Sequence, residues 1–208
     1  MSPRQFALCG AAALSLALAA PCAAHDKGAH DGHGAAAVKP AAGVRLRLAD
    51  TPLVDQDGRE VRLRSELLGK RVAVVNFVYT TCTTVCPVAS ATLAQLQRRL
   101  GDRAGERVLL VSITVDPLRD TPARLREYAA RHEAGPGWRW LTGRKADVDA
   151  ALKAFGAYTP NPEDHPNMTL VGDAESGQWT RLYGFTGVDE LLAQVERALG
   201  VPVARRSH

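Results

Sequence analysis

The pattern of apolar and polar positions marks out a central strand in the first half of the chain. Residues 72–79 read Val-Ala-Val-Val-Asn-Phe-Val-Tyr, a run of β-branched and aromatic residues without charge. Such a run is typical of a strand buried on both faces of a sheet. A second run of this kind, at 107–115, follows a segment, 88–100, whose apolar residues recur at helical spacing. Strand, helix and strand in this order predict a right-handed parallel crossover.

The rest of the pattern predicts short strands and helices around this crossover. Asp57-Gly58 separates two short apolar runs, and an Asp-Gly pair in that position predicts a β-hairpin. Thr121-Pro122 is typical of the first residues of a helix. Later elements are expected as a strand at 138–141, a helix ending at Gly156, strands at 168–171 and 179–183, and a closing helix at 188–199. The whole predicts an α/β domain with a central mixed β-sheet flanked by helices and an N-terminal β-hairpin.

Residues 1–24 have the composition of an export signal peptide. Arg4 is their one charged residue, an apolar run follows, and Cys22-Ala23-Ala24 suits a cleavage site. We expect cleavage rather than a retained anchor, because the apolar run is mostly alanine and contains Pro21. The protein is therefore expected to be exported, to the periplasm or the outer face of the cytoplasmic membrane, where an uncleaved leader would associate it with the membrane.

The predicted domain organisation continues with a flexible, histidine-containing linker at 25–44, which lacks apolar periodicity. His25, His30 and His33 could hold copper or zinc, or could simply belong to a solvated segment; composition leaves both open. The folded domain is expected at 45–200, with a tail at 201–208.

Length, charge and cysteine count narrow the function. A chain of 208 residues, less its leader and tails, leaves one domain with a real core. The net charge of +4 comes from scattered basic residues, which gives no support to nucleic-acid binding. Two of the four cysteines lie in the leader, so Cys82 and Cys86 would be the thiols of the exported protein. A disulfide between them would close only a short turn, so a purely structural role is weak.

Cys82 and Cys86 follow the central strand directly. Pro87 favours the start of a helix and pushes the preceding residue toward extended backbone, which predicts Cys86 as the N-cap and Cys82 in the loop before it. Both sulfurs would then lie near the positive end of the helix, which favours thiolate over thiol. This arrangement suits redox exchange or a soft metal ion.

Three motifs, taken in order, resemble the Sco/SenC family. They are Phe77-x-Tyr79-x-x-Cys82-x-x-x-Cys86-Pro87, Val115-Asp116-Pro117-x-Arg119-Asp120-Thr121-Pro122 and Asp164-His165. The resemblance covers residues 48–199. It implies a thioredoxin-like fold and a role as copper chaperone or thiol reductase in cytochrome oxidase assembly.

The resemblance also implies residue roles. Cys82 and Cys86 would form the redox pair and bind the metal, His165 would be the third ligand, and Asp116 would lie behind them. Two thiolates and one imidazole suit Cu(I), with Cu(II) as a second oxidation state, whereas zinc would prefer a fourth ligand. Asp120 is expected to contribute to a turn and a helix cap rather than to the site.

Two functions from different classes remain. The first is an exported chaperone that delivers Cu(I) to the copper-site subunit of cytochrome c oxidase or to another copper protein. The second is a thiol–disulfide oxidoreductase that reduces the cysteines of that target. Thioredoxins have two residues between their cysteines, and the three found here favour chelation. A peroxiredoxin-type peroxidase is weaker, because Thr83 fits that motif but Tyr79 stands where its proline should be.

Overall fold

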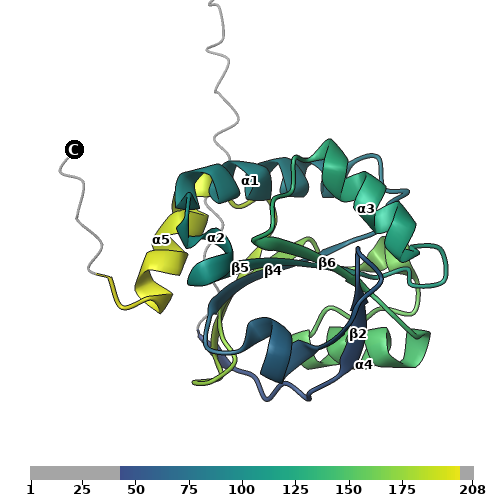
Figure 1. Cartoon of the computed structure of the whole chain (residues 1–208), viewed down its shortest axis with the longest axis horizontal. Helices are drawn as coiled ribbons and strands as arrows, with labels where there is room; N and C mark the ends of the chain where they lie inside the picture. The colour runs from purple at the N-terminus through teal and green to yellow at the C-terminus, as the bar shows by residue number, and fades with distance from the viewer. Residues whose placement is uncertain (1–42, 202–208) are drawn as a thin grey trace, which may run out of the picture. The chain divides into compact units, whose positions relative to one another are not determined.

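An eight-stranded mixed sheet forms the centre of the fold (Figure 1). The computed structural model describes residues 43–201, so the predicted export signal, nearly all of the linker with its three histidines, and the tail after Val201 lie outside the described residues. The strands lie in the order β1-β8-β7-β4-β5-β6-β2-β3. Their bounds are β1 Val44–Arg45, β2 Pro52–Asp55, β3 Glu60–Arg62, β4 Val72–Val78, β5 Val108–Thr114, β6 Trp138–Thr142, β7 Met168–Asp173 and β8 Gln178–Tyr183.

Strand β4 lies at the middle of the sheet, and all seven of its residues are buried. It pairs in parallel with β5, from Val72 opposite Val108 to Val78 opposite Thr114, and antiparallel with β7. The predicted parallel crossover and the hairpin of β2 and β3 are confirmed. With helices on both faces of a mixed sheet, the predicted α/β class is also confirmed.

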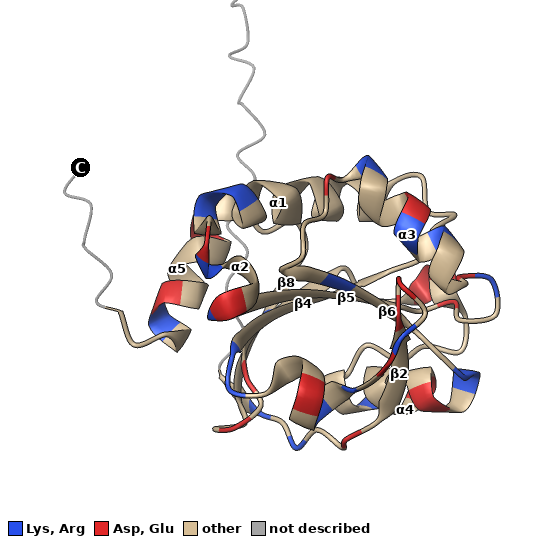
Figure 2. Ribbon diagram, viewed as in Figure 1, with Lys and Arg blue, Asp and Glu red and all other residues tan. Residues whose placement is uncertain are grey.

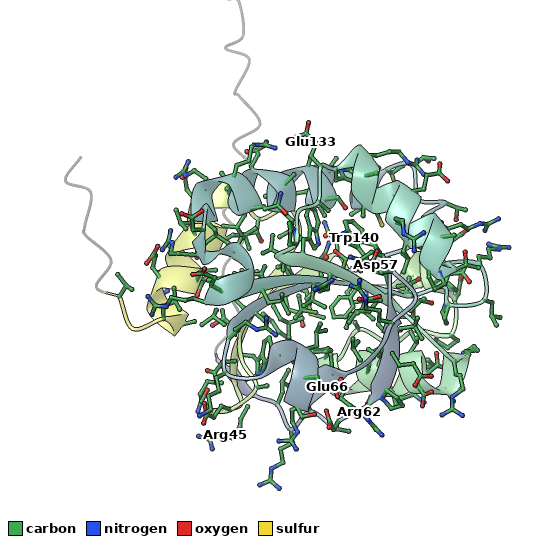
Figure 3. All side chains as sticks on the ribbon, in the orientation of Figure 1. Arg45, Asp57, Arg62, Glu66, Glu133 and Trp140 are labelled. Atoms are coloured by element: carbon green, nitrogen blue, oxygen red, sulfur yellow. The ribbon has the colours of Figure 1, made fainter. Side chains whose placement is uncertain are left out.

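Alternate residues of β4 enter two separate cores, because successive side chains of a strand point to opposite faces. Val75 and Phe77 join the core under α4 (Lys145–Phe155) and the single wide helical turn η1 (Leu63–Leu68). Val74 and Val78 join the core under α1 (Val85–Leu100), α3 (Pro122–Arg131) and α5 (Val188–Ala198). Figure 3 shows Trp140 inside this second layer, between the sheet and the helices.

Two helix ends agree with the sequence. The hydroxyl of Thr121 accepts a hydrogen bond from the backbone N–H of Arg124 at 3.3 Å, as an N-cap does. Gly156 ends α4 with a left-handed φ of 78°.

The start of α1 differs from the prediction. The helix begins at Val85 with Thr84 as its N-cap, so Cys86 lies in the first helical turn and the prediction of Cys86 as N-cap is wrong. Pro87 becomes the third helical residue, which costs no hydrogen bond because the first four N–H groups of a helix have no partner within it.

Three short elements were not predicted. They are β1, which begins one residue before the expected domain boundary and pairs with β8, the turn η1, and α2 (Arg103–Glu106). A 3-10 turn, η2 (Pro162–Asp164), precedes His165.

Charged residues are scattered over the helices and loops rather than gathered into one basic stripe (Figure 2). Within residues 43–201, no helix has the length and apolar composition needed to cross a membrane.

Candidate thiol and metal site

The cysteine turn connects the carboxyl end of β4 to α1. The backbone N–H of Cys82 donates to the carbonyl oxygen of Tyr79 at 3.1 Å, which closes a tight turn directly after the strand. The sulfur of Cys82 then accepts the N–H of Cys86 at 3.4 Å, in the first turn of α1. Both residues are free thiols. The structure therefore brings the two predicted cysteines together through a direct contact.

Cys82 is the more acidic of the two thiols. Burial raises its pKa, but the backbone N–H groups of Cys86 and Thr84, together with side-chain hydrogen bonds from Cys86 and Tyr79, outweigh burial and lower the pKa to about 7. A helix N-terminus that donates to sulfur stabilises the thiolate. For Cys82, this matches the effect expected from the sequence.

Cys86 behaves in the opposite way. Its side chain is 1% exposed, and burial raises its pKa to about 12, with smaller contributions from Cys82 and Asp120. The expectation that the helix end favours both thiolates is thus wrong for Cys86, because the loss of water around a buried sulfur outweighs the helix dipole. The pair is asymmetric, with one thiol ready to ionise at neutral pH and one held protonated.

His165 follows η2, in the loop before β7. Its Nδ1 lies 2.8 Å from the carbonyl oxygen of Pro162. Its ring contacts the ring of Tyr79 edge to face, with centroids 5.7 Å apart. Tyr79 is also one of the groups that lower the pKa of Cys82, so this tyrosine is near the thiol as well as the imidazole. Among residues 43–201, no group of three or more histidine, cysteine or acidic side chains is close enough together to hold a metal ion.

Asp116 lies after β5, at the end of the sheet that carries the thiols. Its carboxylate is 3.5 Å from the guanidinium of Arg119, and its backbone N–H donates to the hydroxyl of Thr114. It also lines a pocket of about 390 Å³ that is shared with residues 159–163 of the loop before His165. Its role behind the metal ligands stays a prediction.

The sequence predicted Asp120 as a turn and helix-cap residue and did not predict its contact with the cysteine turn. Its carboxylate is 1% exposed and accepts hydrogen bonds from Thr80 and Thr114, next to the cysteine turn. In the sequence, Asp120 stands between a buried strand and the helix cap Thr121. An exposed turn residue would occupy the same position, so the sequence alone does not indicate that Asp120 is buried.

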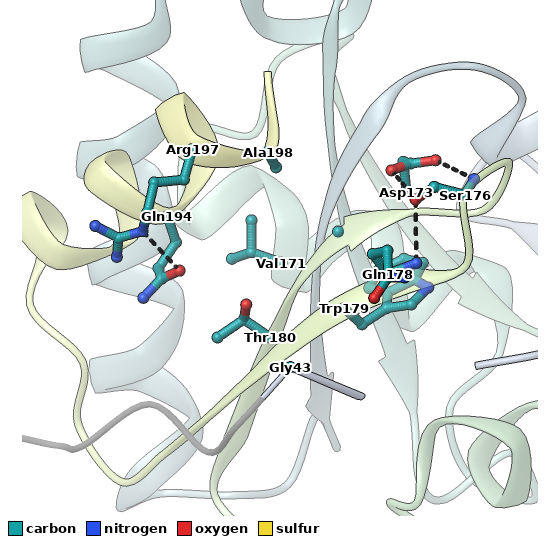
Figure 4. Close-up of a pocket in the computed structure, with 11 residues that line it drawn as sticks. Gly43, Val171, Asp173, Ser176, Gln178, Trp179, Thr180, Gln194, Arg197 and Ala198 are labelled. Carbon is teal, nitrogen blue, oxygen red and sulfur yellow. Dashed lines mark hydrogen bonds between the residues drawn. The ribbon is translucent and has the colours of Figure 1, made fainter. Parts of the chain in front are cut away.

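A larger pocket, of about 500 Å³, lies away from the thiols, between the β7–β8 hairpin and α5 (Figure 4). Its wall includes Gln194 and Arg197, which hydrogen-bond to each other, and Asp173, which binds Ser176. It contains none of the four predicted site residues. The cysteine turn therefore stays the predicted site, separate from this pocket.

Comparison with known proteins identifies the family of the chain. A sequence model of the SCO1/SenC family matches residues 49–200. The SCO1 protein homolog of Bacillus subtilis is 35% identical over 112 residues, which are 52% of this chain and 56% of that protein. Protein SenC of Rhodobacter capsulatus is 34% identical over 133 residues, 60% of this chain and 58% of that protein. The chain thus spans a little over half the length of these relatives.

Solved structures resemble the whole domain. Bradyrhizobium japonicum ScoI with copper bound is 26% identical, with a TM-score of 0.60 over 78% of this chain and 99% of that one. BsSco is described with a disulfide switch and as a member of the Sco family of cytochrome c oxidase assembly proteins. It is 26% identical, with a TM-score of 0.64 over 79% of this chain and 98% of that one. The predicted thioredoxin-like fold is confirmed, and the chain belongs to the SCO1/SenC family.

Proposed function

We propose that this protein is an exported copper-binding chaperone that holds Cu(I) through Cys82, Cys86 and His165. The observation that carries the proposal is the contact between two cysteines with free thiols at the end of a central strand, where the Cys82 sulfur accepts the backbone N–H of Cys86. A relative of the same fold is described with copper bound. Cu(I) is the cargo, and the receiving protein is the copper-site subunit of cytochrome c oxidase or another copper protein.

The donor set suits Cu(I) in chemistry and number. Two thiolates and an imidazole are soft or borderline ligands, and Cu(I) accepts low coordination numbers. Binding requires both thiols to lose their protons, so the raised pKa of Cys86 means that the metal displaces a proton on entry.

The carbonyl of Pro162 prepares His165 for a metal. A carbonyl oxygen can only accept, so Nδ1 must carry the hydrogen in the 2.8 Å contact. In the neutral ring this leaves the lone pair on Nε2, and metal-binding histidines are oriented in the same way by a backbone carbonyl. Because the imidazole and the two sulfurs do not form one metal-holding group within residues 43–201, we propose that copper binding draws the loop after η2 toward the cysteine turn.

A second function, thiol–disulfide exchange, is favoured by the unequal pKa values of the two thiols. The Cys82 thiolate would attack a target disulfide, forming a mixed disulfide and releasing one target thiolate. Deprotonated Cys86 would then attack the Cys82 sulfur, which releases the second target thiolate. The target gains two electrons, and Cys82–Cys86 becomes a disulfide.

The location of the protein follows from the proposed export. Cleavage after Ala24 would release the chain into the periplasm, and retention of the leader would hold it at the outer face of the cytoplasmic membrane. Either place suits delivery to an oxidase copper site.

The variant His165→Ala separates the two functions. Loss of a ligand should weaken Cu(I) binding by roughly 10-fold or more, whereas exchange needs only the cysteines. The measurements are a competitive Cu(I) titration and the rate of reduction of a model disulfide, both on the reduced protein. Glu163→Ala, an exposed change in the same loop, is the matched control. Unchanged copper affinity together with slowed exchange would reject the chaperone and favour the oxidoreductase.

A further inference from the structure

Asp120 is a buried carboxylate whose two oxygens are occupied by two threonines. Oδ1 accepts the Thr80 hydroxyl at 2.5 Å, and Oδ2 accepts the Thr114 hydroxyl at 2.6 Å. The backbone N–H of Thr80 lies 3.3 and 3.2 Å from these two oxygens. Within the described chain, 43–201, Asp120 takes part in no ion pair. A carboxylate buried in this way is costly unless hydrogen bonds compensate it, and here they come from specific partners.

The two threonines lie at the carboxyl ends of the two central parallel strands. Thr114 is the last residue of β5, and Thr80 follows β4. The N–H of Val115 donates to the carbonyl of Val78 at 2.8 Å, so the strands are still paired just before this point. Asp120 therefore continues the connection between β4 and β5 beyond their last backbone hydrogen bond.

Thr80 lies inside the turn that delivers Cys82. The turn is closed by the N–H of Cys82 on the carbonyl of Tyr79, and Thr80 is one of the two residues between them. Fixing Thr80 at both its N–H and its hydroxyl restricts the backbone that places the Cys82 sulfur against the N–H of Cys86. A restricted backbone holds two reacting groups at a higher effective concentration.

We propose that Asp120 is a positioning residue that braces the cysteine turn by tying Thr80 to Thr114. The brace acts on the thiol pair itself, and its effect on copper rests additionally on the proposed function. The brace itself consists of hydrogen bonds, and the charge of Asp120 acts separately, as one of the smaller causes of the raised pKa of Cys86. An asparagine keeps one oxygen for Thr80 and can donate its amide hydrogen to the Thr114 hydroxyl, so it should preserve most of the brace.

The test is the equilibrium of the protein with glutathione, measured without copper. The dithiol and one glutathione disulfide yield the Cys82–Cys86 disulfide and two reduced glutathiones, so atoms and electrons balance. The variants are Asp120→Ala, which removes both ties, Asp120→Asn, and Thr114→Val, which removes one tie at nearly constant volume together with the acceptor of the Asp116 N–H. The matched control is Asp55→Asn, another carboxylate with 2% exposure, which caps the hairpin turn on β2, three strands away from β4.

The brace predicts a graded result. Asp120→Ala should lower the equilibrium constant for disulfide formation by about 10-fold, and Thr114→Val by about 3-fold. Asp120→Asn should stay within about 2-fold of the parent protein, and Asp55→Asn should leave the constant unchanged while lowering only the thermal midpoint.

Two outcomes would contradict the proposal. One is an equilibrium constant for disulfide formation that is the same in Asp120→Ala and the parent protein. The other is an equilibrium constant lowered as much in Asp120→Asn as in Asp120→Ala, which would assign the effect to charge. If Asp120→Ala does not fold, as circular dichroism would show, Thr114→Val and Asp120→Asn decide by the same criteria. Cu(I) titration of the same variants separates the two proposals. A graded glutathione equilibrium with no copper binding by the parent protein supports the brace and rejects the chaperone.

Discussion

The unequal thiols lead to a prediction about chemical labelling. At pH 7 about half of Cys82, with its pKa of about 7, is thiolate, whereas Cys86, with its pKa of about 12, is thiolate in about one molecule in 10⁵. The thiolate of the less acidic thiol is intrinsically the better nucleophile. With a Brønsted slope of about 0.4–0.5, the Cys86 thiolate should react roughly 10²-fold faster than the Cys82 thiolate, which offsets part of the difference in thiolate fraction. The net preference of iodoacetamide for Cys82 should be about 10²- to 10³-fold.

The assay is timed alkylation of the reduced, folded protein, followed by mass spectrometry of the two cysteine positions. The labelling rate of Cys82 should rise with pH, with a midpoint near 7, because its lowered pKa makes the thiolate the main form above that value. Cys86→Ser should keep this profile, since a serine retains the backbone N–H that donates to the Cys82 sulfur. In the unfolded chain, both cysteines should react at similar rates.

Two results would refute this reasoning. One is similar labelling of the two cysteines in the folded protein at pH 7. The other is a Cys82 midpoint near 8.5, the value of an ordinary free cysteine, which would mean that the N–H groups at the start of α1 do not stabilise its thiolate.

Two further outcomes are expected. The dithiol should bind about one Cu(I) and the Cys82–Cys86 disulfide none, because Cu(I) requires thiolates. The measurement is a metal titration of the reduced and the oxidised protein. Undiminished binding by the oxidised protein would place the copper elsewhere, with residues 25–33 to be tested first. Gly172→Ala should lower the free energy of unfolding by about 3 kcal/mol in urea denaturation, because the new Cβ would collide with the Gln178 carbonyl and lie 2.8 Å from the Cα of Trp179. Gly187→Ala, whose Cβ meets nothing within 4 Å, should cost less than about 1 kcal/mol, and an equal loss in both variants would contradict the argument.

The centre of the fold could be predicted from sequence because its signals are strong and local. Strand β4 is an uninterrupted apolar run, and the Thr121-Pro122 cap and Gly156 terminator act within one helical turn. The short elements β1 and η1 were missed. A strand of two residues is too short to show an alternating pattern of apolar and polar residues. The pairing of Val44 with Trp179 joins distant parts of the chain, so the local sequence does not indicate it.

The contact between Cys82 and Cys86 was predictable from the sequence, but the unequal pKa values of the two thiols were not. The spacing of Cys82 and Cys86 indicated a shared turn, but how far each sulfur is removed from water depends on the folded core under α1 and α3, which both cysteines join. The same limit applies to Asp120, since only the folded chain shows that Thr80 and Thr114 meet its carboxylate. The contact of His165 with Tyr79 likewise joins residues far apart in the sequence.

The antiparallel pairing of β4 with β7 has a consequence for the order of events during folding. Cys82 and Cys86 are neighbours in the chain and can meet as soon as one helical turn forms, whereas the loop of His165 reaches the same end of the sheet only when β7 pairs with β4. Contacts between distant segments form late, because closing a long loop costs entropy before it brings any stabilisation. A newly folding chain therefore presents a bare dithiol before it presents the complete proposed ligand set, and during that interval it is more exposed to oxidation than the finished protein.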